Sequence, residues 1–358
     1  LLKLRPENSQ SIANDLLSSS FISSGKSFLC NLISICITYI YMKPKEILVF
    51  GASGQIGRHL LRKLTKRNFK VTVVTRNLHR KAYILKSQAN AGWMNIVELG
   101  NLNYEKLSEI FKNKDICINL IGILNENRKS SFHNIHCILP KTLAQLSKEN
   151  NLKQFIQISA LGIEEAIDSK YAQSKLNGEN EIRKIFDNHV ILKPSLVYSV
   201  DDKFTTMLMS MLKLFPIFPI YYNGKTNFYP IHVTDMCEII DQIVLNEIHT
   251  KTIECIGPEK ISFKDILKKL INVMAIRRIL LPTPLFVAKI FANFFEISMK
   301  NPLLTKDQLN LLNYHNVPSG KYSTNLELKL NQNLKFFEDE VLKYSFMWKT
   351  GGEFSKQK

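Results

Sequence analysis

Three glycines in the spacing G-x-x-G-x-x-G, at Gly51, Gly54 and Gly57, constrain the fold more than any other feature of the chain. They follow an apolar run at 47–50, typical of a buried parallel strand, and precede residues 59–64, where apolar residues recur at helical spacing. In such a turn the first glycine lets the chain leave the strand sharply, the second lets the backbone approach a pyrophosphate, and the third lets the helix pack against the sheet. The helix N-terminus offers free N–H groups and partial positive charge to phosphates.

This context predicts a dinucleotide-binding loop, the alternative being an ordinary strand-to-helix turn. The residues predicted to contact the cofactor here are Gly51, Ser53, Gly54, Gln55, Ile56 and Gly57. The next strand, 70–75, ends in Thr75-Arg76-Asn77 and lacks the acidic residue that usually binds the ribose 2′-OH of NAD. The planar guanidinium of Arg76 suits a 2′-phosphate, so NADP(H) is favoured over NAD(H). The alternative is an arginine that ends a strand in solvent.

Strands and helices alternate along the first half of the chain. Residues 96–99, 116–121 and 155–158 predict three more strands, and 139–148 predicts a helix. This alternation indicates an α/β fold with a Rossmann-type, doubly wound parallel sheet, in which ligands bind at the carboxyl ends of the strands. Further cofactor contacts are therefore predicted at Asn101 and Leu102 after the third strand and at Asn119 and Gly122 at the end of the fourth. Pro194 is also a predicted cofactor contact.

A tyrosine and a lysine follow the fifth predicted strand in the spacing Y-x-x-x-K. Tyr171 and Lys175 are four residues apart, so on a helix they share one face. A nearby ammonium lowers the pKa of a tyrosine, which would otherwise be near 10 and poorly matched to acid–base work at neutral pH. Ser159, at the end of the strand, could hold a substrate carbonyl. The three residues are therefore candidate catalytic residues, with Tyr171 and Lys175 also next to the cofactor; the alternative is an ordinary amphipathic helix.

Composition limits the partners. The 358 residues are 45% hydrophobic, enough for a sizeable core, and the net charge is +17. This charge suggests an anionic partner, such as acidic lipid or an acidic protein face, or else a lysine-rich composition without function. No basic patch with interleaved aromatics and no metal-ligand spacing is present, so neither nucleic acid nor metal is predicted. Six scattered cysteines without a C-x-x-C pair indicate buried thiols in a reducing compartment.

The chain divides into four predicted parts. Residues 1–41 are serine-rich, and their apolar run at 28–41 is short for a spanning helix. We predict that they form a leader outside the fold, with untranslated upstream sequence favoured over a targeting peptide or a short membrane anchor. A Rossmann domain is predicted at 42–200, and a smaller closing α/β region on the substrate side at 201–345, from which 232–256 returns to the sheet. Residues 346–358 form a tail.

The glycine motif, Ser159 and Y-x-x-x-K together resemble the short-chain dehydrogenase/reductase superfamily in its extended or atypical branch. Later motifs narrow the resemblance: I-L-K-P-S-L-V-Y at 191–198, N-G-K-T at 223–226, Y-P-I-H-V-T-D at 229–235 and L-L-T-K-D-Q at 303–308. This series resembles the NAD(P)-binding accessory subunits of respiratory complex I and their bacterial relatives, over nearly all of 43–355. The sequence departs from that pattern at Asn101, where relatives often have an aspartate, and at Ser199, where a glycine is usual.

The resemblance implies a protein that binds NADPH tightly and stabilises a complex, with subunits of complex I as partners. It implies a place on the cytoplasmic face of a bacterial inner membrane or in the cytoplasm, or on the matrix side in mitochondria. Because Tyr171 and Lys175 are retained, an NADP-dependent oxidoreductase or a sugar-nucleotide epimerase or dehydratase remains the alternative.

Residues 283–300 predict an amphipathic helix with apolar side chains around most of its circumference. Its polar stripe prevents an uninterrupted spanning run. The helix therefore packs in the core or against a partner, or it lies on an anionic membrane surface, for which the nearby cations Arg277, Arg278, Lys289 and Lys300 are suited. Further back, Asp235 follows a strand and is predicted to cap the next helix.

Overall fold

The computed structural model describes residues 44–100, 103–127, 130–298, 302, 304–349 and 351–352. The predicted leader, 1–41, lies outside the described residues. So do Asn101 and Leu102, which the sequence predicts next to the cofactor, and Lys300.

Eight strands form one sheet: β1 (Glu46–Phe50), β2 (Lys70–Thr75), β3 (Met94–Glu98), β4 (Ile116–Asn119), β5 (Gln154–Ile158), β6 (His189–Pro194), β11 (Lys251–Cys255) and β14 (Ser323–Thr324). Their order is β14-β11-β6-β5-β4-β1-β2-β3, and all neighbours are parallel. The order reverses between β1 and β4, which is the switch point of a doubly wound sheet. The predicted Rossmann-type α/β fold is confirmed.

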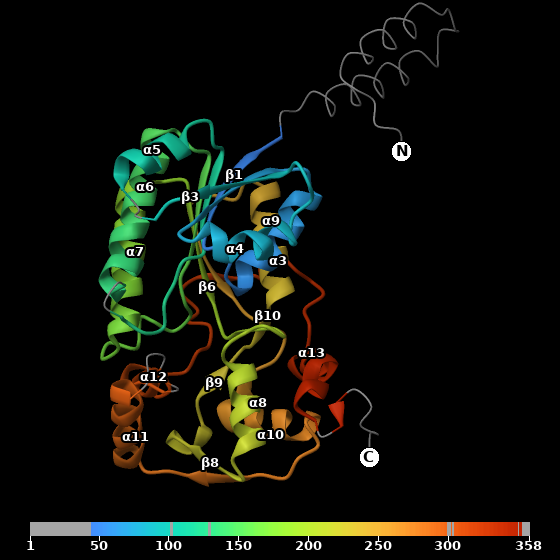
Figure 1. Ribbon diagram of the computed structural model, residues 1–358. Helices are drawn as coiled ribbons and strands as arrows, with labels where there is room; N and C mark the ends of the chain where they lie inside the picture. Colours follow the sequence, from blue (N-terminus) through green and yellow to red (C-terminus); the bar gives the residue numbers. More distant parts are fainter. Residues whose placement is uncertain are drawn as a thin grey trace, which may run out of the picture. The chain divides into compact units, whose positions relative to one another are not determined.

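Helices cover both faces of this sheet (Figure 1). One face carries α3 (Gln55–Lys66), α4 (Leu78–Lys86) and α9 (Val233–Leu245), and the other carries α5 (Tyr104–Phe111), α6 (Leu139–Glu149) and α7 (Lys170–Ile185). A π-helical turn, η2 (His133–Ile138), leads directly into α6. The sequence predicted the helix from 139 but gave no sign of this turn.

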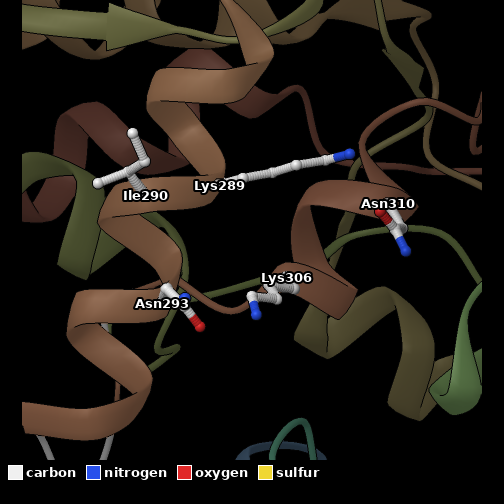
Figure 2. A pocket seen from close by; sticks show the side chains of 5 residues that line it. All are labelled: Lys289, Ile290, Asn293, Lys306 and Asn310. Atoms are coloured by element: carbon white, nitrogen blue, oxygen red, sulfur yellow. The ribbon is translucent and has the colours of Figure 1, made fainter.

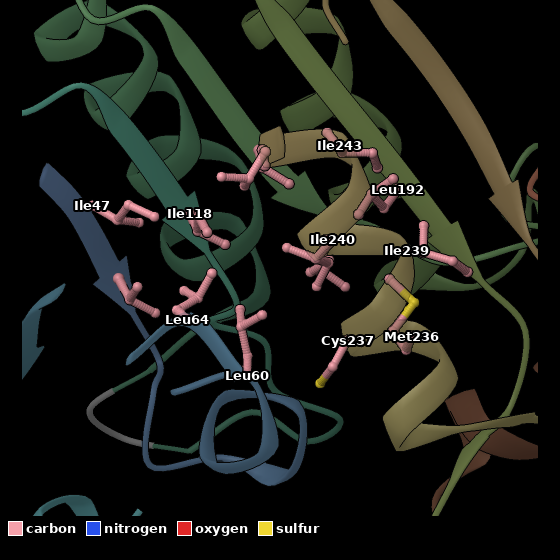
Figure 3. Close-up of a cluster of buried hydrophobic side chains, with 14 of the residues drawn as sticks. Ile47, Leu60, Leu64, Ile118, Leu192, Met236, Cys237, Ile239, Ile240 and Ile243 are labelled. Atoms are coloured by element: carbon pink, nitrogen blue, oxygen red, sulfur yellow. The ribbon is translucent and has the colours of Figure 1, made fainter. Parts of the chain in front are cut away.

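Alternation along β1 explains how one strand supplies two cores. Ile47 and Val49 pack toward α3 and α9, whereas Leu48 and Phe50 pack toward α5 and α6. Successive side chains of a strand point to opposite faces, so a strand with helices on both sides must be apolar throughout. Figure 3 shows the first of these cores, where Ile240 and its neighbours on α9 meet the sheet and α3.

The chain beyond β6 builds a smaller region with a core of its own. Its elements are β7 (Val197–Tyr198), α8 (Thr205–Leu214), β8 (Ile217–Ile220), η3 (Tyr222–Gly224), β9 (Asn227–Phe228), β10 (Ile231–His232), β12 (Ile261–Ser262), α10 (Phe263–Val273), β13 (Ile279–Pro282), α11 (Leu285–Ser298), α12 (Lys306–Leu311), α13 (Phe337–Tyr344) and η4 (Ser345–Trp348). Tyr198, Phe263 and Phe337 are among the buried residues at its centre. Between these elements, α9 and β11 belong to the main sheet and its cover.

Helices α9 and α11 bear on two of the sequence predictions. The cap of α9 is His232, whose side chain accepts from Thr234 N, so the prediction that Asp235 caps this helix is wrong. Asp235 instead accepts from Lys335 N at 2.9 Å. In α11, Ala288 and Ala292 are buried, while Phe286 is 68% exposed. Among the described helices, none is long and apolar enough to cross a membrane.

Replacing Ile240 by alanine tests the core between the sheet and α9. Ile240 is fully buried, so the lost apolar contacts and the cavity left behind should cost about 2–5 kcal/mol of unfolding free energy. The matched control is Ile167→Ala, because Ile167 is 73% exposed and should cost less than about 0.5 kcal/mol. Urea unfolding of both variants measures the difference. Equal losses would contradict the packing described here.

Candidate functional site

The turn from β1 to α3 requires glycine at two positions. Gly51 has φ +77°, and a Cβ there would lie 2.9 Å from the carbonyl carbon of Leu120 at the end of β4. At Gly57 a Cβ would lie 2.4 Å from Ala52 Cα, so the first turn of α3 rests directly on the loop. Gly54 differs, because an added Cβ would meet only Gly51 O, at 3.2 Å. The loop is therefore tight toward the protein and open over Gly54.

The first turn of α3 is not capped by a side chain. Gln55 turns toward the smaller region, where its amide donates to Ser199 Oγ at 2.8 Å and to Val197 O at 3.3 Å. Ser199 thus has a structural contact with α3. The uncapped N–H groups and the helix dipole fit a diphosphate in this turn.

Two basic side chains lie at the adenosine end of the predicted site. Arg76 directly follows β2 and is exposed. Lys81, in α4, donates from Nζ to Ser53 Oγ at 3.1 Å and so reaches the glycine loop. Sequence analysis missed Lys81, although a basic residue in the first turns of the helix after β2 is a usable signal. Together they place two positive charges beside the end of β2 and the glycine loop.

The other predicted contacts follow β4 and β6. Asn119 is fully buried; it donates to Gln157 Oε1 at 2.8 Å and accepts from Ile121 N at 3.1 Å, so its side chain shapes the turn after β4. At Gly122 a Cβ would lie 3.5 Å from Lys175 Nζ, which places this glycine next to the lysine. Pro194 is buried at the end of β6 and accepts from Leu161 N at 3.0 Å.

Tyr171 and Lys175 share a face of α7, as their spacing predicts. Lys175 Nζ is 6.0 Å from the centroid of the Tyr171 ring and donates to Ile158 O at 3.1 Å. Burial raises the pKa of Tyr171 to about 12, with a further rise from the Asp307 carboxylate. Burial also lowers the pKa of Lys175 to about 8, against the opposing effect of Glu179. The expectation that the lysine lowers the tyrosine pKa is wrong, because desolvation outweighs an ammonium at this distance.

The side chain of Ser159 is hydrogen-bonded to Glu179. Its hydroxyl donates to Glu179 Oε1 at 2.5 Å, and Glu179 also accepts from Arg183 at 2.8 Å. Lys193, which is fully buried, lies 3.3 Å from the same carboxylate. None of the hydrogen bonds found in the described part of the chain joins Ser159 to Tyr171 or Lys175. Its predicted role toward a substrate carbonyl stays a prediction.

His136, in η2, is a site residue that sequence analysis missed. Its Nε2 accepts from Ile123 N at 3.1 Å, so Nδ1 carries the proton and donates to Ser174 Oγ at 2.9 Å. Ser174 in turn donates to Tyr171 O at 2.7 Å, and the His136 and Tyr171 rings meet edge to face at 5.3 Å. Burial, and then the Lys175 charge, lower the pKa of His136 to about 3. A histidine in an apolar run gives no sequence signal for this role.

Two cavities lie away from these residues. One of about 430 Å³ lies between α11 and α12, where Figure 2 shows Lys289 extending from α11 toward Asn310. The other, of about 670 Å³, is lined by α3, α9 and 329–335 and is rich in lysine. Within the described ranges no group of His, Cys, Asp or Glu side chains is arranged to hold a metal ion.

Replacing His136 by glutamine should flatten the loss of stability at acid pH. Folding lowers the pKa of His136 from 6.5 to about 3, so within this window the unfolded chain binds a proton that the folded chain does not. The contribution is complete above pH 6.5 and is lost as the pH falls toward 3. We expect the slope of unfolding free energy against pH to decrease by about one proton in His136→Gln. Urea unfolding across the upper part of this window measures it; unchanged slopes would contradict a neutral buried His136.

Comparison with known proteins agrees with this geometry. The chain is 26% identical over 270 residues to NADH dehydrogenase [ubiquinone] 1 alpha subcomplex subunit 9, mitochondrial, of Mus musculus, covering 75% of this chain and 72% of the relative. The protein of the same name from Dictyostelium discoideum is 27% identical over 86% of both chains. Bordetella bronchiseptica WbmG, solved in complex with NAD, has the same fold, with a TM-score of 0.64 at 12% identity over 86% of this chain and 94% of that one. Residues 47–255, which contain the glycine turn, Tyr171 and Lys175, match a family described as NAD dependent epimerase/dehydratase. With more than half of its length matched in this way, the chain belongs to the NAD dependent epimerase/dehydratase family.

Proposed function

We propose that this chain binds NADP(H) and holds it as a structural cofactor within a respiratory NADH:ubiquinone oxidoreductase. The names of the mouse and Dictyostelium relatives, both subunits of NADH dehydrogenase, support the assembly. The open face over Gly54 and the uncapped N-terminus of α3 support the cofactor. A cofactor bound there would stabilise the folded subunit by mass action.

The burial of Tyr171 beside the Asp307 carboxylate supports the proposal that the cofactor is held rather than turned over. With the tyrosine pKa raised to about 12 and the lysine pKa lowered to about 8, the phenol is protonated and weakly acidic at neutral pH. A general acid works best when its pKa lies near the operating pH. The pair therefore suits a site that shapes the pocket next to the cofactor better than one that transfers protons.

The preference for NADP(H) over NAD(H) is part of the proposal. Arg76 and Lys81 supply two positive charges at the end of β2, and the acidic residue that selects NAD is missing there. The guanidinium of Arg76 can donate two parallel hydrogen bonds to one phosphate, and the ammonium of Lys81 adds a point charge.

An oxidoreductase or a sugar-nucleotide epimerase remains the second candidate, because the Tyr171–Lys175 pair is retained on one face of α7 next to Gly122. A bound nicotinamide would supply hydride chemistry, and Tyr171 would hold or donate the proton at the reacting carbonyl. Tyr171→Phe separates the candidates. An enzyme loses its activity and keeps NADPH binding, whereas a structural subunit assembles as before.

Location follows from the partners, and we propose the matrix side of the mitochondrial inner membrane or the cytoplasmic face of a bacterial one. Residues 203–234 and 266–295 contain eight lysines and arginines and no acidic residue. Exposed apolar side chains lie in the same stretches: Leu214, Ile217, Ile279, Leu281 and Phe286. Lys268 and Lys269 pair with carboxylates outside these stretches. Exposed apolar groups among the other lysines and arginines suit an anionic lipid surface.

Arg76→Ala and Lys81→Ala test the cofactor proposal. Each variant removes a charge-assisted contact worth about 1.5–3 kcal/mol, so the Kd for NADPH should rise by at least about tenfold. For Arg76→Ala the Kd for NADH should stay unchanged, whereas for Lys81→Ala, whose side chain also contacts Ser53 of the glycine loop, the Kd for NADH should rise less than that for NADPH. Lys86→Ala, at an exposed position near the end of the same helix, is the matched control. Isothermal titration with both nucleotides measures the effect. Equal losses for NADH and NADPH would contradict recognition of the 2′-phosphate.

A further inference from the structure

Residues 305–316, called the strap here, lie across the carboxyl edge of the sheet. In a doubly wound fold this edge is where ligands bind. The strap contacts residues that follow three strands: Asn125 after β4, Leu161 after β5 and Ser195 after β6. The strap therefore lies where a substrate would have to enter in order to reach Tyr171.

Asp307 fixes the strap to the start of the helix that carries the tyrosine. Its carboxylate accepts from Ser169 Oγ at 2.9 Å, from Lys170 N at 2.8 Å and from Tyr171 N at 3.3 Å. Helix N-termini leave N–H groups without partners and attract negative charge. Ser169 already caps α7 through Ala172 N, so Asp307 completes the capping from a segment more than 130 residues away in the sequence.

The far end of the strap is held as closely. Asn316 donates to Leu161 O at 2.6 Å and accepts from Ser195 Oγ at 2.5 Å. Gly162, in the turn after β5, has φ +75°, and a Cβ there would lie 2.8 Å from His315 O. No side chain fits between the strap and this turn.

The middle of the strap is stiff and packed. Thr305 and Gln308 form a capping box at the start of α12, and Gln308 also reaches Asn125 Oδ1 at 3.4 Å. Leu311 and Tyr314 pack against a small buried cluster that contains Ile163, Ala166 and Ala172. Thr226 and Asn227 of the smaller region bond to the strap through Leu312 O and through His315 and Asn316. The strap thus joins both regions of the chain.

We propose that the strap closes the substrate side of the nicotinamide pocket, so that the site takes the dinucleotide alone and excludes a second ligand of sugar size. Asp307 is the positioning residue that holds this closure against α7. The proposal rests on the proposed function, because it concerns the nicotinamide of a bound NADP(H). It explains how the chain keeps Tyr171 and Lys175 and yet holds its cofactor without turnover.

Quenching of bound NADPH fluorescence by acrylamide tests the closure, because acrylamide must reach the nicotinamide by collision. In the full chain loaded with NADPH we expect weak quenching. Asp307→Ala removes all three contacts and should raise the quenching constant at least threefold, while Asp307→Asn keeps an acceptor and should lie between. Asp339→Ala, at an exposed carboxylate of α13, is the matched control and should match the unaltered chain.

The outcomes separate the two proposals. If the unaltered chain binds no NADPH, the proposed function fails. If it binds NADPH but is quenched strongly, or if Asp307→Ala binds NADPH and is quenched no more than the control, the closure is wrong. Should Asp307→Ala fail to fold, Gln308→Ala breaks the capping box and the Asn125 contact instead and must raise quenching above the control for the closure to stand.

Discussion

The close contact between helix α3 and the glycine loop that precedes it is the constraint on which the rest of the structure depends. A Cβ at Gly57 would lie 2.4 Å from Ala52, and one at Gly51 would lie 2.9 Å from the backbone after β4. Only glycine permits this approach, and the approach aims the N-terminus of α3 at the carboxyl edge of the sheet. Gly122 and Lys175 lie next to each other beyond the carboxyl ends of β4 and β5, at the same edge of the sheet.

Several polar groups on β5, β6 and α7 are hydrogen-bonded or ion-paired within the protein. Ser159 and Glu179 belong to a buried network with Arg183 and Lys193, and the Lys193 ammonium lies 5.1 Å from the centre of the Tyr322 ring. Buried ion pairs add little net stability, but removing one partner leaves an unpaired buried charge. This network holds the middle of α7 through Glu179 and Arg183, and Asp307 of the strap holds its first turn.

Features that depend on residues close together in the sequence could be predicted from it. Glycine spacing and strand–helix alternation predicted the parallel strands β1 to β5, whereas β6, β11 and β14 were not predicted as strands. Helical spacing put Tyr171 and Lys175 on one face. Contacts distant in sequence were missed: Lys81 to Ser53, His136 to Ile123 and Asp307 to Tyr171. The tyrosine pKa was predicted in the wrong direction because spacing says which side chains are neighbours but not how far water is excluded from them. Asp235 was misassigned for a related reason, since its partner is a backbone N–H a hundred residues away.

The central claim is that a pyridine nucleotide lies with its diphosphate on the backbone amides between Gly51 and Gly57. Native mass spectrometry of the protein purified from its own source tests it most directly, with Gly54→Val as the comparison, because a side chain there would project into the open face of the loop. The account predicts that the unaltered protein carries the mass of NADP(H), and that the variant is folded by circular dichroism and empty. An unaltered protein detected without bound nucleotide, or a variant that retains the nucleotide equally, would contradict the account.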